Sequence, residues 1–369
     1  MMFTFHHPVE IRFGEGVISQ INEIIEAQGY TRVVIVSANS QIENGVIEFI
    51  KTQLGESVRE IVSDIEANPT LENVEAIVRA IDAHNVHAVV AVGGGSAMDA
   101  AKAAAAAYMQ GIEVRNLLDH GDFTRALPII AVPSTSGSAS EVTASSIISD
   151  KQQGLKVPLI GPALYPKTAI VDPELTLTCP KSVTAISGID ILCHALDCLG
   201  SVKNNPISDA LAIRASKLAF ENLLTAYQEP SNREARTNLS LASMTAGMAF
   251  SQTGTSGSHA MSYYLTSHYD VPHGEACAFS MDAWYAVNAK ANPALHQHAR
   301  DIGFDDAEAL SEAFNKLKGQ MGLAVAFEDL GISRDDIPEI AEESLRPANM
   351  KNNIAQLSRD EIIEMLERK

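Results

Sequence analysis

One carboxylate and several histidines recur along the chain at spacings that suit a single metal ion. Asp190 and His194 are four residues apart, so on a helix both side chains stand on one face, one turn apart. Further along the chain come His259, His268 and His273. A carboxylate oxygen combined with imidazole nitrogens suits a borderline divalent ion such as Fe²⁺ or Zn²⁺. The sequence therefore predicts a metal site, from which we exclude His268 as a solvated loop histidine.

A glycine-rich turn in the first half of the chain is the second chemical signal. The apolar run 88–92 leads into Gly93, Gly94, Gly95 and Ser96, and a helix is expected to follow. Glycines let the backbone approach an anion closely, and a helix start offers free N–H groups. The turn matches neither GxGxxG nor the P-loop pattern. Taken alone, it fits a diphosphate site and a tight turn without a ligand equally well.

A second polar segment follows the next apolar run. Residues 134–149 are rich in serine and threonine but also contain β-branched apolar residues, which favour an ordered loop and strand over a disordered linker. The carboxyl ends of neighbouring parallel strands lie along one edge of a sheet, where ligands bind. The two segments together predict a nucleotide site.

The elements that must position these residues differ between the two halves. In the first half, strand-like and helical segments alternate, which implies a parallel sheet with helices on both faces. The expected strands are 32–36, 88–92 and 128–133, and the expected helices are 46–54, 72–84 and 97–108. Later segments are helical in pattern, at 183–199, 209–227, 232–250, 275–288 and 307–321. We therefore expect an α/β, Rossmann-like dinucleotide-binding domain at 1–177 and an all-α metal-binding domain at 178–369.

Composition narrows the class of protein. The 369 residues contain 46 acidic and 27 basic side chains, a formal charge of −19, which argues against nucleic acid or an anionic membrane as partner. The first residues show no signal-peptide pattern, and the apolar run 100–108 is too short to span a bilayer. The four cysteines show no metal or disulfide spacing, so buried thiols in a reducing compartment are expected. These features predict a soluble cytoplasmic protein.

Several motifs, taken in order, resemble those of the iron-containing (group III) alcohol dehydrogenase family. They are FGEG at 13–16, NPT at 68–70, GGGSAMDAAK at 93–102, the EVT that ends 133–143, DPEL at 172–175 and GIDILCHA at 188–195. His259 is followed fourteen residues later by the histidine of a PHG, His273. The resemblance covers nearly the whole chain.

The resemblance implies a set of site residues. The four metal ligands would be Asp190, His194, His259 and His273, with Fe²⁺ or Zn²⁺ as the ion. The cofactor, NAD or NADP, would be bound by Gly94, Gly95, Ser96, Asp99, Ser134, Thr135, Thr143 and Lys156. The partners would be a small alcohol or aldehyde and further copies of the chain, in a homodimer or a larger homo-oligomer.

Two positions depart from the family pattern. Many members have a second histidine four residues after the third ligand, near the nicotinamide, where this chain has Tyr263. Tyr263 is either a proton relay or a packing residue. Members that prefer NAD often have an acid just after the strand at 32–36, where this chain has Ala38. Because an acid there repels a 2′-phosphate, we expect usable activity with NADPH.

The predicted function is an NAD(P)-linked alcohol dehydrogenase or aldehyde reductase. One alternative is a metal-dependent lyase of the dehydroquinate-synthase type, which shares the two-domain plan. Such enzymes need several basic residues for phosphorylated substrates, and few lie near the ligands in the helical half. The other alternative is a nucleotide-binding protein without catalysis, which turnover of any simple aldehyde would exclude.

Overall fold

The structure, a computed structural model, describes residues 2–151 and 155–369. The chain divides into two compact units. The α/β unit comprises residues 7–179. The helical unit comprises residues 180–369 together with residues 2–6, whose last member His6 exchanges two hydrogen bonds with the Gln252 amide.

A six-stranded sheet organises the α/β unit, with strand order β1-β8-β5-β4-β2-β3. Every pairing in it is parallel, which confirms the sheet type that the alternating pattern predicts. The strands are β1 (Glu10–Phe13), β2 (Val33–Ser37), β3 (Val58–Val62), β4 (Ala88–Gly93), β5 (Ile129–Pro133) and β8 (Thr168–Val171). A separate antiparallel pair follows β5 and consists of β6 (Ser145–Asp150) and β7 (Leu155–Ile160).

Alternation along the central strands explains why helices cover both sheet faces. Val34 and Val36 of β2 pack into one core with α4 and α5, whereas Val33 and Ile35 pack into another with α1 and α3. Successive strand side chains point to opposite faces, so β2 is buried along its whole length. The helices of this unit are α1 (Ile21–Ala27), α2 (Asn39–Glu43), α3 (Val46–Leu54), α4 (Leu71–His84) and α5 (Gly95–Gln110).

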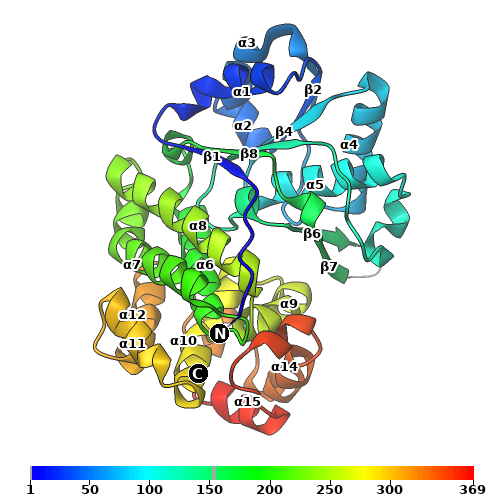
Figure 1. Ribbon diagram of the computed structural model, residues 1–369. Coiled ribbons are helices and arrows are strands. Elements are labelled where there is room, and N and C mark those ends of the chain that lie inside the picture. The colour runs from blue at the N-terminus through cyan, green and yellow to red at the C-terminus, as the bar shows by residue number, and fades with distance from the viewer. Residues whose placement is uncertain (1, 152–154) are drawn as a thin grey trace. The chain divides into compact units, whose positions relative to one another are not determined.

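Between residues 180 and 369, all the regular elements are helices, which confirms the expected all-α half (Figure 1). The α-helices are α6 (Lys181–Leu199), α7 (Pro206–Gln228), α8 (Arg233–Thr253), α9 (Gly257–Tyr269), α10 (His273–Ala291), α11 (Ala294–Ile302), α12 (Ala307–Gln320), α13 (Phe327–Leu330), α14 (Ile337–Ser344) and α15 (Arg359–Leu366). Short 3₁₀ segments join elements throughout the described chain: η1 (Val17–Gln20), η2 (Gly55–Ser57), η3 (Val114–Asp119), η4 (Ser140–Val142), η5 (Pro162–Leu164), η6 (Pro173–Thr176), η7 (Arg334–Asp336) and η8 (Ala348–Asn352).

Helix α6 is the core of the helical unit. It is apolar on nearly all sides and packs against α7, α8 and α10. By length and composition it is the one helix in the described chain that could cross a membrane, but 78% of its most apolar window is buried inside the protein. A helix that is hydrophobic all round is expected in such a core.

Candidate metal centre and cofactor site

The structure brings the four predicted metal ligands together within the helical unit. Asp190 and His194 lie one turn apart on α6, His259 lies in the first turn of α9, and His273 is the first residue of α10. The Asp190 carboxylate oxygens lie 3.7 Å from His194 Nδ1 and 3.7 Å from His259 Nε2. The His259 ring meets the His273 ring edge-on, with centroids 5.6 Å apart.

Two of these side chains have buried polar atoms that a cation would satisfy. Asp190 and His259 are 5% and 3% exposed. Asp190 Oδ1 and His259 Nε2 make no hydrogen bond to any residue in the described chain. Leaving such atoms unpaired is costly, whereas a shared divalent ion accepts both lone pairs. The residues present therefore fit a metal ion, and the donor set suits Fe²⁺ or Zn²⁺.

A fifth side chain, Cys277, joins this cluster. Ligand atoms from Asp190, His259, His273 and Cys277 all lie within 4.8 Å of one another. Burial raises the pKa of the Cys277 thiol. Sequence reasoning treated the cysteines as packing residues and missed this one, although its position four residues after His273 on a helix was a usable signal.

Asp197 is a second residue that sequence reasoning missed. Its Oδ2 lies 2.7 Å from His259 Nδ1 and also accepts the Ser256 backbone N–H at 2.8 Å. Its Oδ1 accepts the Ser256 hydroxyl at 2.8 Å. A carboxylate that accepts from Nδ1 leaves the His259 lone pair on Nε2, on the side of Asp190. Asp197 therefore orients the His259 ring with Nε2 toward Asp190.

The neighbouring histidines keep both buried carboxylates ionised. Burial opposes ionisation of Asp190, but His194, His273 and His259 together hold its pKa below the usual range. Burial also opposes ionisation of Asp197, but the hydrogen bond with His259 holds its pKa below the usual range. The cluster is thus prepared to hold positive charge.

Glycines allow the helices of this centre to approach one another. A Cβ on Gly274 would lie 2.0 Å from the Ile186 carbonyl oxygen of α6, so any side chain there would push α10 away. A Cβ on Gly257 would lie 2.6 Å from the Trp284 ring. The glycine of the PHG motif is therefore required by the contact that brings His273 beside Asp190.

The glycine-rich turn has the geometry of an anion site in the α/β unit. Gly93 has φ +149°, in a region that favours glycine, and ends β4. Helix α5 begins at Gly95, and its N-cap residue Gly94 makes no side-chain cap hydrogen bond, so Gly95 and Ser96 lie in the first turn, where the N–H groups have no partner within the helix. A Cβ on Gly95 would lie 2.7 Å from Ser138 Oγ. The two polar segments are thus neighbours, as expected from the parallel pairing of β4 with β5.

A buried lysine organises the second polar segment. Lys102 of α5 is 0% exposed, and its Nζ donates to Ser140 Oγ at 2.8 Å and to the carbonyls of Thr143 and Ser145 at 2.9 Å. Burial lowers its pKa to about 8. Glu141, which follows Ser140, is 2% exposed, and burial raises its pKa to about 7 although the Lys102 charge acts the other way.

The other expected cofactor residues lie around this network. Asp99 accepts from Ser140 Oγ at 2.6 Å on one oxygen and from the Ile147 N–H at 2.8 Å on the other. Both its oxygens are thus already hydrogen-bonded within the protein. Lys156 of β7 donates to Asn68 Oδ1 at 2.7 Å. The remaining members are Ser134 and Thr143, which are buried, and Thr135, which is partly exposed beside Gly94.

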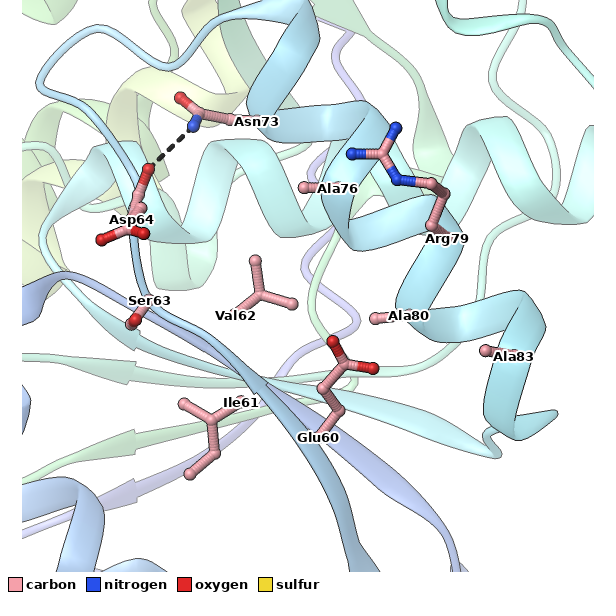
Figure 2. Close-up of a pocket in the computed structure, with 10 residues that line it drawn as sticks. All are labelled: Glu60, Ile61, Val62, Ser63, Asp64, Asn73, Ala76, Arg79, Ala80 and Ala83. Atoms are coloured by element: carbon pink, nitrogen blue, oxygen red, sulfur yellow. Dashed lines mark hydrogen bonds between the residues drawn. The ribbon is translucent and has the colours of Figure 1, made fainter.

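An acidic residue, Asp64, lies next to Ala38, a neighbour that the sequence alone did not indicate. Asp64, two residues beyond β3, pairs with Ala38 in an isolated bridge, and its Oδ1 accepts from Asn39 Nδ2 at 2.8 Å. Figure 2 shows Asp64 held by Asn73, whose amide donates to the Asp64 backbone oxygen at 2.9 Å. Asp64 also lines a surface hollow of about 460 Å³ along β3 and α4.

The two remaining side chains singled out in the sequence both lie on α9. Tyr263 follows His259 by one turn and is half-buried; burial raises its pKa, while His259 acts to lower it. His268 was expected on a loop, but it lies in the last turn of α9, exposed and stacked on Tyr264 with centroids 4.9 Å apart. The helix extends to Tyr269, and Asp270 ends it in a left-handed conformation.

Comparison with known proteins places the chain in a family. Residues 8–173 match the family model "Iron-containing alcohol dehydrogenase", and residues 184–369 match "Fe-containing alcohol dehydrogenase family, C-terminal". The chain belongs to the iron-containing alcohol dehydrogenase family. Membership confirms the resemblance and makes the chain an oxidoreductase acting on CH–OH groups.

Relatives and a solved structure match most or all of the chain. The chain is 30% identical over 378 residues to 1,3-propanediol dehydrogenase from Citrobacter freundii, covering 99% of this chain and 98% of that one. It is 35% identical over 326 residues to 1-propanol dehydrogenase PduQ from Salmonella typhimurium, covering 83% and 84%. The structure of sulfoacetaldehyde reductase from Bifidobacterium kashiwanohense in complex with NAD⁺ matches with a TM-score of 0.94 and 35% identity, covering 100% and 98%.

Proposed function

We propose that the protein is a metal-dependent, NAD(P)-linked alcohol dehydrogenase or aldehyde reductase for small primary alcohols and their aldehydes. The observation that carries the proposal is the buried pair of Asp190 Oδ1 and His259 Nε2, two potential metal-ligand atoms that lie 3.7 Å apart and have no hydrogen-bond partner among the described residues, in a member of a metal-dependent family. Relatives named for 1-propanol, 1,3-propanediol and sulfoacetaldehyde support the substrate class.

The proposed ligands are Asp190, His194, His259 and His273, and the ion is Fe²⁺ or Zn²⁺. A divalent ion held there supplies Lewis-acid polarisation of a substrate oxygen. Asp197 fixes the tautomer of His259, and ionised Asp190 brings negative charge to the site. Gly274 keeps α10 close enough to α6 for His273 to join them.

The proposed cofactor site is the pair of polar segments after β4 and β5. Gly94, Gly95 and Ser96 present the first turn of α5 to the diphosphate, and Ser134, Thr135 and Lys156 line the same edge. NAD or NADP held by these residues would supply hydride-transfer chemistry to the substrate carbon. Because the Asp99 and Thr143 side chains hydrogen-bond within the Lys102 network, we assign these two residues to positioning the second segment.

Cofactor choice is proposed to depend on Asp64. The exposed Asp64 carboxylate lies beside Ala38, the position whose acid often binds the ribose 2′-hydroxyl in this family. Asp64 thus supplies the negative charge that position 38 lacks, which disfavours a 2′-phosphate. We therefore propose that NAD(H) is preferred and that NADP(H) activity, expected from Ala38 alone, is limited by Asp64.

Proton transfer is assigned to Tyr263 as a proposal. Its phenol lies one turn from His259 on α9, and its ring is half-buried. A cytoplasmic location and a homodimer or larger homo-oligomer complete the proposal. The cytoplasmic location is supported by Cys193, Cys198 and Cys277, which are buried thiols in the described chain.

The deciding experiment is a screen of small aldehydes with NADH and NADPH on metal-stripped protein before and after reloading with Fe²⁺ or Zn²⁺. We expect turnover that requires metal and returns on reloading. Turnover that is unaffected by stripping, verified by elemental analysis, would contradict the proposed metal role.

A further inference from the structure

Cys277 lies at ligand spacing from a proposed metal ligand. It is 0% exposed on α10, and its Sγ lies 3.8 Å from Nε2 and 3.9 Å from Nδ1 of His273. Sulfur and nitrogen ligands of one tetrahedral zinc ion, bound at roughly 2.3 and 2.05 Å, are about 3.6 Å apart. The thiol is therefore placed where a ligand of the same ion would be.

The atoms around the thiol point independently to a bound cation. His259 Nε2 and Asp190 Oδ1 are buried and make no hydrogen bond to any residue that the structure describes. Both residues belong to the group of four, with His273 and Cys277, in which one ligand atom from each residue lies within 4.8 Å of the others. This group contains one oxygen, two nitrogens and one sulfur, a complete tetrahedral set.

His194 is the one proposed ligand outside this group of four, and it lies beside two of its members. The His194 ring is stacked on Phe250 with centroids 4.2 Å apart and on His259 with centroids 4.7 Å apart. Its Nδ1 lies 3.7 Å from Asp190 Oδ2. The centre thus offers five candidate ligands, and an ion bound close to α10 would lie within reach of the Cys277 sulfur.

We propose that Cys277 Sγ is a direct metal ligand, so that the centre holds its ion through a thiolate as well as through carboxylate and imidazole groups. This inference rests on the metal centre of the proposed function. On binding, the thiol proton is released to solvent and the S–metal bond forms, with no change of oxidation state. A soft thiolate favours Zn²⁺, whereas Mn²⁺ favours oxygen ligands. The centre should therefore select Zn²⁺ over Mn²⁺ more strongly than an oxygen and nitrogen site does.

The test is the absorption spectrum of the metal-stripped protein loaded with Co²⁺. Visible d–d bands report that cobalt is bound, and a near-ultraviolet thiolate-to-cobalt charge-transfer band reports sulfur coordination. The variant is Cys277→Ala, with Cys277→Ser as a second variant if alanine impairs folding. The matched control is Cys198→Ala, a buried cysteine of α6 whose Sγ lies 3.9 Å from the Ser208 carbonyl oxygen in α7.

We expect both kinds of band in the unaltered protein and in Cys198→Ala. In Cys277→Ala, the d–d bands should persist and the charge-transfer band should disappear. Zn²⁺ affinity should decrease at least about tenfold in this variant and Mn²⁺ affinity much less. Visible bands without a charge-transfer band in the unaltered protein, or a band that survives in Cys277→Ala, would overturn the thiolate ligand alone. Absence of all cobalt bands would overturn the metal centre itself.

Discussion

The Asp197 carboxylate lies 2.7 Å from His259 Nδ1, on the opposite side of the ring from Asp190. Asp197 therefore orients the imidazole, while Asp190 lies beside Nε2, the nitrogen proposed to bind the metal ion. Asp197 follows Asp190 by seven residues, so both project from one face of α6 two turns apart. A single helix thus carries a proposed ligand and the group that orients a ligand from another helix.

Replacing Asp197 with Asn should weaken metal binding. Both oxygens of Asp197 accept hydrogen bonds, Oδ2 from His259 and the Ser256 N–H and Oδ1 from the Ser256 hydroxyl. The NH₂ group of an asparagine must replace one of these oxygens and would then face a hydrogen-bond donor. We expect a loss of about 10–100-fold in metal affinity, measured by competition with a chelator. Glu221→Gln, on the exposed surface of α7, is the control. Equal affinity in Asp197→Asn and the unaltered protein would contradict the orienting role.

Replacing His259 or His273 with Ala should remove the metal and nearly all turnover. Each change deletes a donor from the cluster, whereas the glycine-rich turn lies in the α/β unit. Metal content by elemental analysis should fall, and NADH binding measured by fluorescence should persist. His268→Ala is the matched control, because His268 lies exposed on the same helix as His259. Full activity in His259→Ala or His273→Ala would remove the proposed site.

The placement of Asp190 beside His194, two of the proposed ligands, was predictable because spacing along a helix is a local property. Asp190 and His194 are four apart, and α6 places them on one face as that spacing predicts. The role of Asp197 was not predictable, because it depends on where α9 packs against α6. The spacing of Cys277 from His273 was a local signal, but its approach to Asp190 and His259 depends on how α10 packs. The sequence shows the spacing of Asp197 and Cys277 along their own helices but not which residues of other helices they contact.

Glu141 should make the stability of the α/β unit depend on pH. Burial raises its pKa to about 7 from an unfolded value near 4.5, so between these values the folded state binds more protons than the unfolded one. Stability therefore falls as pH rises from about 4.5 to 7, by up to about 3 kcal/mol. Glu141→Gln should abolish this contribution. Melting temperatures should be similar at pH 5 and several degrees higher for the variant at pH 8; a constant difference would contradict the raised pKa.

Cofactor choice should respond to charge at two adjacent positions. Ala38→Asp adds a carboxylate beside Asp64 and should shift the ratio of kcat/KM values toward NADH by at least about tenfold, roughly 1.4 kcal/mol. Asp64→Asn removes a charge and should shift the same ratio toward NADPH. Glu60→Gln, farther back on β3, is the control for net charge. If neither Ala38→Asp nor Asp64→Asn changes the ratio, the 2′ position is recognised elsewhere.

The α/β fold was predictable from runs such as 88–92, because a strand buried on both faces is apolar throughout. The environment of Ala38 was not, because Asp64 reaches it through the pairing of β2 with β3 and lies 26 residues away in the chain. The order of strands in a sheet is a long-range property that local pattern does not contain. For the same reason the Lys102 network, which joins α5 to residues 140–145, appears only in the structure.

Replacing Tyr263 with Phe separates chemistry from packing, because the ring stays and only the hydroxyl is lost. The phenol lies one turn from His259, and burial raises its pKa, so it stays protonated at neutral pH and can donate a proton. A general acid contributes roughly 10²–10⁴ in rate, whereas a neutral hydrogen bond contributes about 1 kcal/mol, several-fold. We expect kcat to fall more than about a hundredfold with metal content unchanged. A change below about threefold would identify Tyr263 as a packing residue and assign the proton to the cofactor ribose or to water.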